Sequence, residues 1–441
     1  MLILLLSFNG FPQEKKRSTL SSRQITEVVD SLSKAIKNYY IFPDKGAKMS
    51  TYLKDQFKKG IYQHITDPAK LAYRLETDIR KINYDAHLHI NFDPNVNAPK
   101  DLSPEEKDKA EKEQLQAEKE NNFNIRKVEV LPGDIGYFRF DGFTPYTEEA
   151  KPTLTAALTF LSNTKALIID LRYNGGGSTI NQLASYFFNK RTHLYDQVST
   201  MDKDTVSMYT NSSPTNGSAL LMPLYILTSK NTASAAEAFT ASMKSLKRAI
   251  VIGDTTLGAS HFTGFFPIGY GFIAMIPIAR PVNTATFKDW EGIGVVPNIS
   301  VPAATALQKA QEAIYQALLN NAKTERQKRI IQWSINELKR EDNFIISDTT
   351  ILNTYVGTYA GGITFYVEKG KLLCKNPERG GTDIFKLKAV SDHVFLLDEN
   401  AQVEFLENAE GNYSVINLLF KDGNVIQKSR ELKNKFEHLE K

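Results

Sequence analysis

The sequence lacks the features that would mark a disulfide-bonded, membrane-spanning or nucleic-acid-binding protein. Its single cysteine, Cys374, excludes an internal disulfide and any metal cluster built from several cysteines. The apolar run at residues 2–8 is far shorter than the roughly 20 residues of a membrane span. The formal net charge is only +4, from 54 Lys and Arg against 50 Asp and Glu, so no nucleic-acid partner is expected.

The composition is otherwise that of a soluble globular protein, with 41% hydrophobic and 24% charged residues in 441 positions. This length allows two or three domains. Residues 2–8 precede a polar segment but follow no basic residue, so residues 1–21 resemble an incomplete export signal with a linker. A periplasmic or secreted location is the expectation, with a frayed apolar N-terminus and a cytoplasmic location as the alternatives.

After residue 21, periodicity divides the chain into three parts. Apolar residues at helical spacing predict a three-helix bundle over residues 22–84. Strands then alternate with helices over residues 85–345, which predicts an α/β core that ends in one helix over 303–338. Within this core, residues 93–126 are dense in Glu and Lys and predict a solvated excursion. Short alternating runs separated by turns predict a small β-barrel or sandwich over residues 348–432.

Ser234 is the first candidate for chemistry. It follows a predicted buried strand at residues 223–228 and precedes a predicted helix at 235–246. The start of a helix offers unpaired N–H groups and the positive end of the helix dipole. A serine at that position is most often a simple N-cap, so Ser234 alone does not establish a function.

A glycine-rich loop is the second candidate. The segment Asp170-Leu171-Arg172-Tyr173-Asn174 ends an apolar strand and is followed by three glycines and Ser178. Glycines permit positive φ and a close approach of the backbone to a ligand. The loop lacks the lysine of a P-loop and the spacing of a dinucleotide fingerprint. Its N–H groups could stabilise an oxyanion, or the loop could be a plain tight turn.

Two further segments contain titratable side chains. His87 lies in Asp85-Ala86-His87, between the predicted bundle and the core, and Glu291 lies in a glycine-containing turn, Trp290-Glu291-Gly292. A lone histidine is more often structural than catalytic, and a carboxylate in a turn is usually solvated.

Taken in order, these motifs resemble the carboxy-terminal-processing and tricorn group of serine peptidases, which includes the modules of interphotoreceptor retinoid-binding protein. The resemblance covers roughly residues 22–320, without a PDZ insert. It implies a crotonase-like core of ββα units. It also implies Ser234 as the nucleophile, and an oxyanion hole formed by the N–H of Ala235 and a glycine N–H, Gly176 or its neighbour Gly175.

The resemblance also bears on the identity of the base. Ala259 occupies the position of the lysine used by the processing branch, so a Ser–Lys dyad is not supported. Lys244 lies about 15 Å further along the helix from Ser234 and cannot easily replace it. The tricorn-like branch uses a histidine and a glutamate that match His87 and Glu291. His89 and His261 are rival bases, and only the family match favours His87.

A serine, histidine and glutamate form a coherent catalytic set, because the imidazole accepts the hydroxyl proton and the carboxylate orients the imidazole. The absence of Gly-x-Ser-x-Gly argues against an α/β-hydrolase. The sequence therefore predicts a serine peptidase that hydrolyses short or partly unfolded peptides through an acyl-enzyme, with no metal or cofactor. The alternative is a catalytically weak or inactive protein that binds apolar ligands or peptides on the same fold. An aromatic stretch, Phe262, Phe265, Phe266, Tyr270 and Phe272, could line its apolar cleft, although core packing is the more usual role of such residues.

Overall fold

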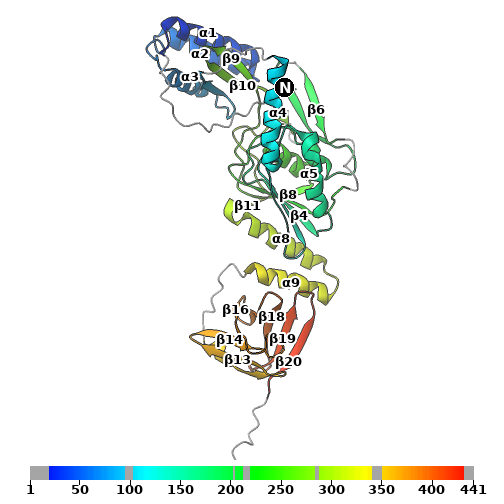
Figure 1. The fold of residues 1–441 in the computed structure, drawn as a ribbon. Helices are drawn as coiled ribbons and strands as arrows, with labels where there is room; N and C mark the ends of the chain where they lie inside the picture. The colour runs from blue at the N-terminus through cyan, green and yellow to red at the C-terminus, as the bar shows by residue number, and fades with distance from the viewer. Residues whose placement is uncertain are drawn as a thin grey trace, which may run out of the picture. The chain divides into compact units, whose positions relative to one another are not determined.

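The chain divides into two compact units in the computed structural model, residues 1–130 with 135–307, and residues 131–134 with 308–441 (Figure 1). Residues 2–8, the predicted export signal, lie outside the described part of the chain. No helix in the described part is long and apolar enough to cross a membrane. The structure describes residues 19–94, 103–201, 204–211, 219–283, 288–339 and 350–431.

Three helices begin the first unit, as predicted. The first starts at a capping box, in which Gln24 N donates to Ser21 Oγ (3.3 Å) and Ser21 N donates to Gln24 Oε1 (2.8 Å). The third starts where Lys70 N donates to Asp67 Oδ1 (3.1 Å). The apolar faces of these helices share one core with strands β1, β9 and β10 (Figure 1). The bounds are α1 (Ser22–Tyr39), α2 (Pro43–Lys58), α3 (Pro68–Ile82), β1 (His89–Phe92), β9 (Phe262–Gly269) and β10 (Phe272–Val282).

The charged excursion forms a solvated helix. Helix α4 (Pro104–Glu120) has no buried residue, as its Lys- and Glu-rich sequence predicts. It starts at a second capping box, in which Glu106 N donates to Ser103 Oγ and Ser103 N donates to the Glu106 carboxylate. The short η1 (Asn122–Asn124) follows it.

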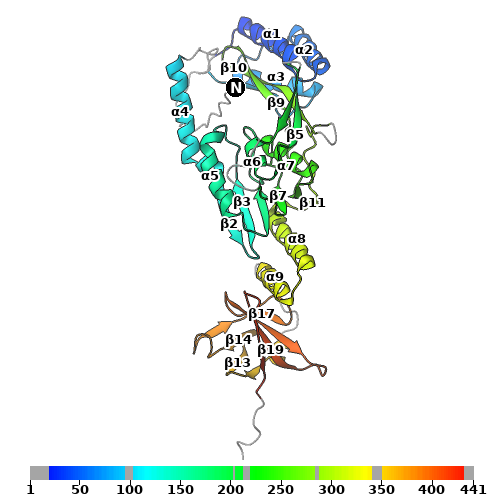
Figure 2. The same cartoon turned by 90° about the vertical axis from the view of Figure 1, so that its right-hand side faces the viewer.

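A six-stranded sheet in the order β11-β8-β7-β4-β3-β2 forms the centre of the first unit (Figure 2). The pairs from β11 to β3 are parallel, and β4 and β7 are buried along their whole length, as continuous apolar runs predict. Helix α6, which lies between β4 and β7 in the chain, is short. The bounds are β2 (Ile125–Leu131), β3 (Ile135–Phe140), α5 (Thr147–Phe160), β4 (Ala166–Asp170), α6 (Asn181–Ser185), β7 (Leu224–Thr228), α7 (Ala235–Ser245), β8 (Ala249–Gly253) and β11 (Ile299–Ser300).

The topology brings the candidate residues to one end of the sheets. Strands β4 and β7 are neighbours, and their carboxyl ends lead to the glycine loop and to Ser234. In the second sheet, β10 pairs with β1, β9 and β5 (His193–Ser199), and β5 pairs with β6 (Thr205–Tyr209). His87 and His261 lie just before β1 and β9, and Glu291 lies beyond the end of β10.

The helical segment after β11 departs from one prediction. The single helix predicted over residues 303–338 is wrong, because the chain breaks it into η2 (Ala303–Thr305), α8 (Ala306–Asn321) and α9 (Glu325–Lys339). At the break, Gln327 Oε1 accepts from the N–H groups of Lys323 and Thr324, and Gln327 N donates to Thr324 Oγ1 (3.2 Å). These side-chain bonds cap a new helix start.

Two antiparallel sheets follow, of four and five strands, with one common core that includes Tyr355 stacked on Phe405. The strands described form no closed barrel. The predicted domain boundaries stay predictions. The bounds are α10 (Ile351–Thr354), β12 (Gly357–Tyr359), β13 (Ile363–Glu368), β14 (Lys371–Lys375), β15 (Ile384–Lys386), β16 (Lys388–Ala389), β17 (Val394–Leu396), β18 (Ala401–Glu407), β19 (Tyr413–Phe420) and β20 (Val425–Ser429).

Replacement of Ile169 on β4 tests the central position of this strand. Ile169 is fully buried, so Ile169→Ala should lower the free energy of unfolding by about 3 kcal/mol, as chemical denaturation measures. The matched control is Ile250→Ala on β8, where the side chain is 41% exposed and the loss should be about 1 kcal/mol at most. Equal losses in the two variants would contradict the assigned core.

Candidate active site

Ser234 occupies a strained backbone position between β7 and α7. Its φ and ψ are 51° and −120°, whereas an N-cap residue normally has extended backbone angles. A non-glycine residue with positive φ costs about 1–3 kcal/mol and persists only where its surroundings enforce it. A serine nucleophile on a strained strand-to-helix turn is known from the nucleophile elbow of α/β-hydrolases. The backbone thus favours a functional role over a simple cap.

Glu237 holds the turn in place. Its fully buried carboxylate accepts hydrogen bonds from Ser234 N (3.0 Å), Gly258 N (2.7 Å) and Ala259 N (2.8 Å), and from the Thr256 hydroxyl. Ser234 N also donates to Ala259 O (3.1 Å). Burial raises the pKa of Glu237, although these donors oppose the rise. Glu237 was not among the predicted site residues, although its place three positions after the serine was a signal in the sequence.

The glycine loop packs directly against the serine. Gly176 has a φ of 107°, and a Cβ added there would lie 2.6 Å from Ser234 Cβ and 2.9 Å from Ala233 O. Asn174 ties the loop to the turn, because its carbonyl accepts from Ala233 N (3.1 Å). Only glycine allows this approach of the two backbones.

The predicted oxyanion donors differ in their availability. The N–H of Gly176 donates to Asn174 Oδ1 (2.9 Å), so this donor is already engaged. Within the described part of the chain, no hydrogen bond is made by the N–H groups of Gly175 and Ala235. Ala235 N is 3.0 Å from the position of a Gly176 Cβ, which places that N–H beside the loop.

His87 is half-buried just before β1. Its backbone N–H donates to Asp85 Oδ1 (3.0 Å), and its buried ring Nδ1 has no hydrogen-bond partner among the described residues. Burial lowers the pKa of His87 to about 4; the charge of Asp85 opposes this shift and the charge of His261 adds to it. The imidazole is therefore neutral at neutral pH and able to accept a proton.

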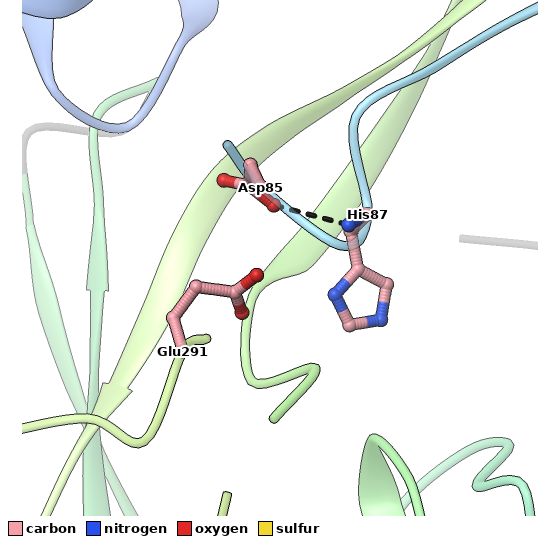
Figure 3. Close-up of side chains that lie close together, drawn as sticks. All are labelled: Asp85, His87 and Glu291. Carbon is pink, nitrogen blue, oxygen red and sulfur yellow. Dashed lines mark hydrogen bonds between the residues drawn. The ribbon is translucent and has the colours of Figure 1, made fainter. Parts of the chain in front are cut away.

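Glu291 lies beside His87 and is fixed by backbone donors. Its Oε1 accepts from Ala86 N (2.8 Å), and its Oε2 accepts from Ser260 N (2.7 Å) and His261 N (3.3 Å). Burial, followed by the charge of Asp85, raises the pKa of Glu291. Figure 3 shows one ring nitrogen of His87 facing the Glu291 carboxylate and the other facing away from it.

The two halves of the candidate site meet at consecutive residues. Ser234 N is bonded to Ala259 O, and Glu291 is bonded to Ser260 N and Oγ. The Cα atoms of consecutive residues are about 3.8 Å apart, so the serine turn and the glutamate are anchored side by side. No hydrogen bond joins Ser234 to His87. Such contacts are often long before substrate binds.

The rival bases are engaged elsewhere. His89 Nδ1 lies 3.2 Å from an Arg80 nitrogen and 3.5 Å from Glu76 Oε1 on α3. His261 is buried and its Nδ1 bonds Asp85 Oδ2 at 2.7 Å. Lys244 Nζ donates to Val296 O (2.5 Å), and Ala259 provides no amine.

The aromatic stretch of residues 262–272 does not form one cleft wall. Phe266 stacks on Tyr39 with ring centroids 4.6 Å apart, and Phe272 is buried in the same core. Phe265 and Tyr270 are exposed. The stretch is thus divided between core packing and surface.

One group of described residues has the spacing of metal ligands. Single ligand atoms of Asp85, His87 and Glu291 lie within 4.8 Å of one another. The carboxylate oxygens, however, already accept hydrogen bonds: Asp85 from Tyr40, His87 N and His261, and Glu291 from backbone N–H groups. Donors directed at these oxygens would repel a cation, so the group does not fit a metal ion.

Substitution of the neighbouring loop glycines tests the contact with the serine. Gly176→Ala should lower the free energy of unfolding by about 2 kcal/mol, because the new methyl group overlaps Ser234 at a positive φ. Gly175→Ala is the matched control, since nothing lies within 4 Å of its added Cβ, and it should change stability by less than about 0.5 kcal/mol. Thermal or chemical denaturation measures both, and a tolerated Gly176→Ala would contradict the close approach.

Two stretches of the chain match the models of known protein families. Residues 134–301 match peptidase family S41, and residues 18–132 match the N-terminal domain of Peptidase_S41 in eukaryotic IRBP. A curated relative, carboxyl-terminal-processing peptidase 2, chloroplastic, from Arabidopsis thaliana, is 29% identical over 182 residues, which are 39% of this chain and 34% of the relative. The chain therefore spans about a third of that relative's length.

Solved structures are also similar to this chain, at lower sequence identity. A lipoprotein from Streptococcus agalactiae is 17% identical with a TM-score of 0.44, covering 71% of this chain and 100% of its own. The photosystem II D1 C-terminal processing protease is 14% identical with a TM-score of 0.42, covering 64% and 93%. The family assignment rests instead on the two family matches, which follow one another along residues 18–132 and 134–301. The chain belongs to peptidase family S41.

Proposed function

We propose that the protein is a serine peptidase with Ser234 as its nucleophile, His87 as its base and Glu291 as the residue that orients His87. The observation that carries the proposal is the strained backbone of Ser234, with φ of 51°, packed against a glycine loop at the end of two parallel strands. Family membership supports it, and so does the placement of His87 beside Glu291.

The proposed reaction starts when Ser234 Oγ attacks the carbonyl carbon of a peptide bond. The hydroxyl proton passes to the ring nitrogen of His87 that faces away from Glu291. The negative charge on the former carbonyl oxygen is stabilised by the N–H of Ala235 and by an N–H of the glycine loop. Because the Gly176 N–H is engaged by Asn174, Gly175 is the better loop donor in the unliganded state.

The intermediate then collapses to an acyl-enzyme. His87 returns its proton to the leaving amine as the C–N bond breaks, and water repeats the sequence to release the acid. Glu291 stabilises the imidazolium in both steps. Its two oxygens are held by backbone N–H groups, so its position does not depend on flexible side chains.

The substrate class follows from the family and from the relatives. The Arabidopsis relative is named for carboxyl-terminal processing. For this chain we propose short or partly unfolded peptides as substrates. We also propose that the core is of the crotonase type, which the parallel pairing of the strands from β3 to β11 supports. An extracytoplasmic location belongs to the same proposal and rests on residues 2–8.

Loss of the Ser234 hydroxyl tests the proposal. Ser234→Ala should lower kcat/KM for a mixed peptide library by about 10⁴-fold or more and abolish labelling by a serine-directed phosphonate. Ser162→Ala, an exposed serine, is the control and should keep wild-type rates and labelling. Undiminished hydrolysis by a folded Ser234→Ala protein would reject the assignment.

The pH profile tests the base. His87 accepts a proton only when neutral, and its pKa is lowered to about 4. The neutral fraction therefore stays high as the pH falls from 7 to about 5 and is lost as the pH falls through about 4. The acidic limb of kcat/KM should have its midpoint well below 6, and a midpoint near the ordinary histidine value of about 6.5 would contradict the role of a buried His87.

A further inference from the structure

His261 lies at the centre of a buried group of carboxylates. Only 3% of its surface is exposed, and its Nδ1 bonds Asp85 Oδ2 at 2.7 Å. The same nitrogen lies 3.7 Å from Glu291 Oε2, and Nε2 lies 3.7 Å from Asp289 Oδ2. One imidazole thus faces three acidic side chains from two separate segments.

His261 is the group that can supply a positive charge next to Asp85, as the partners of the other carboxylates show. Arg280 forms an ion pair with Asp289 at 2.9 Å and so balances the negative charge of that carboxylate. Asp85 is fully buried, and its other partners are neutral, namely the Tyr40 hydroxyl (3.0 Å) and the His87 N–H (3.0 Å). A buried carboxylate without a cation is costly. An imidazolium at His261 removes this cost.

The remaining neighbours of His261 are a phenyl ring and a second imidazole. Phe42 contacts His261 edge to face at 5.7 Å between ring centroids, and His87 is the other imidazole close enough to be affected. Burial opposes the charge, yet the carboxylates of Asp289 and Asp85 raise the pKa of His261 to about 9. Burial raises the pKa of Asp85, but the hydrogen bond and charge of His261, together with the bonds from His87 N and Tyr40, outweigh burial and lower that pKa.

The carboxylates of Asp85 and Glu291 bind the backbone of the segment that contains His87, the proposed base. Asp85 Oδ1 accepts the N–H of His87, and Glu291 Oε1 accepts the N–H of Ala86. His261 therefore contacts both carboxylates, and these accept the backbone N–H groups of the consecutive residues Ala86 and His87. Its positive charge also disfavours a second imidazolium at His87.

We infer that His261 is a permanently protonated positioning residue, which fixes Asp85 and Glu291 around His87 and keeps the His87 imidazole in its neutral, proton-accepting form. The inference rests on the proposed function for its meaning in catalysis, but it concerns the charge states of two histidines and can be measured without turnover. It also removes His261 from the candidate bases, because a ring that already carries both protons cannot accept another.

The variant His261→Asn tests this role. Asparagine keeps a donor near the position of Nδ1 but carries no charge. By NMR, the titration midpoint of His87 should rise by about one pH unit relative to the wild type, since a neighbouring positive charge is lost. The acidic limb of kcat/KM should shift in the same direction. His193→Asn, which removes a more exposed histidine paired with Asp196 (2.8 Å), is the matched control and should shift neither.

The wild-type protein provides a test that does not depend on folding of the variant. Imidazole ¹⁵N shifts at pH 7 should show both nitrogens of His261 protonated. A neutral His261 at pH 7, or a His87 midpoint unchanged in folded His261→Asn, would overturn the inference. Failure of the proposed function would appear separately, as hydrolysis and phosphonate labelling that survive Ser234→Ala.

Discussion

The buried carboxylate of Glu237 is the interaction on which the candidate site depends. It gathers donors from Ser234, Thr256, Gly258 and Ala259, and so fastens the strained start of α7 to the segment that leads into β9. Without these bonds the positive φ of Ser234 would relax towards an ordinary cap, at a gain of about 1–3 kcal/mol. The glycine loop can then pack on Ser234 because Gly176 has no side chain.

The segment from Thr256 to His261 also connects Ser234 to the buried group formed by Asp85, Glu291 and His261. Ala259 bonds the Ser234 N–H through its carbonyl, Ser260 bonds Glu291, and His261 bonds Asp85. Three consecutive residues thus bond the proposed nucleophile, the proposed orienting carboxylate and the carboxylate that accepts the backbone N–H of the proposed base. In this chain the position of the family's lysine is an alanine, and its neighbours organise a histidine and a glutamate instead.

Much of the first unit could be predicted because its signals are local. The helical spacing before residue 84, the continuous apolar strands and the Lys- and Glu-rich segment each correspond to an observed element. The juxtaposition of Ser234 with the glycine loop was implied by the family resemblance, and it agrees with the rule that sites gather at the carboxyl ends of parallel strands. His87 and Glu291 came from the family resemblance, since neither has a local signal of its own.

The parts that sequence reasoning missed depend on contacts distant in the chain or on single side chains. The break at Thr324 depends on one glutamine that caps a new helix within an otherwise helical pattern. The roles of Glu237 and His261 depend on partners 19 and 176 residues away. The charge of a buried carboxylate or imidazole depends on its burial and on its partners, and the periodicity of the sequence gives no information on either.

The most direct test of the account is a crystal structure of the protein after reaction with a serine-directed phosphonate. The account predicts phosphorus bonded to Ser234 Oγ, a phosphoryl oxygen accepting the N–H of Ala235, and a ring nitrogen of His87 within about 3.2 Å of the adduct. An unmodified Ser234 in a folded protein, or an adduct with His87 turned away and Glu291 unpaired, would contradict it.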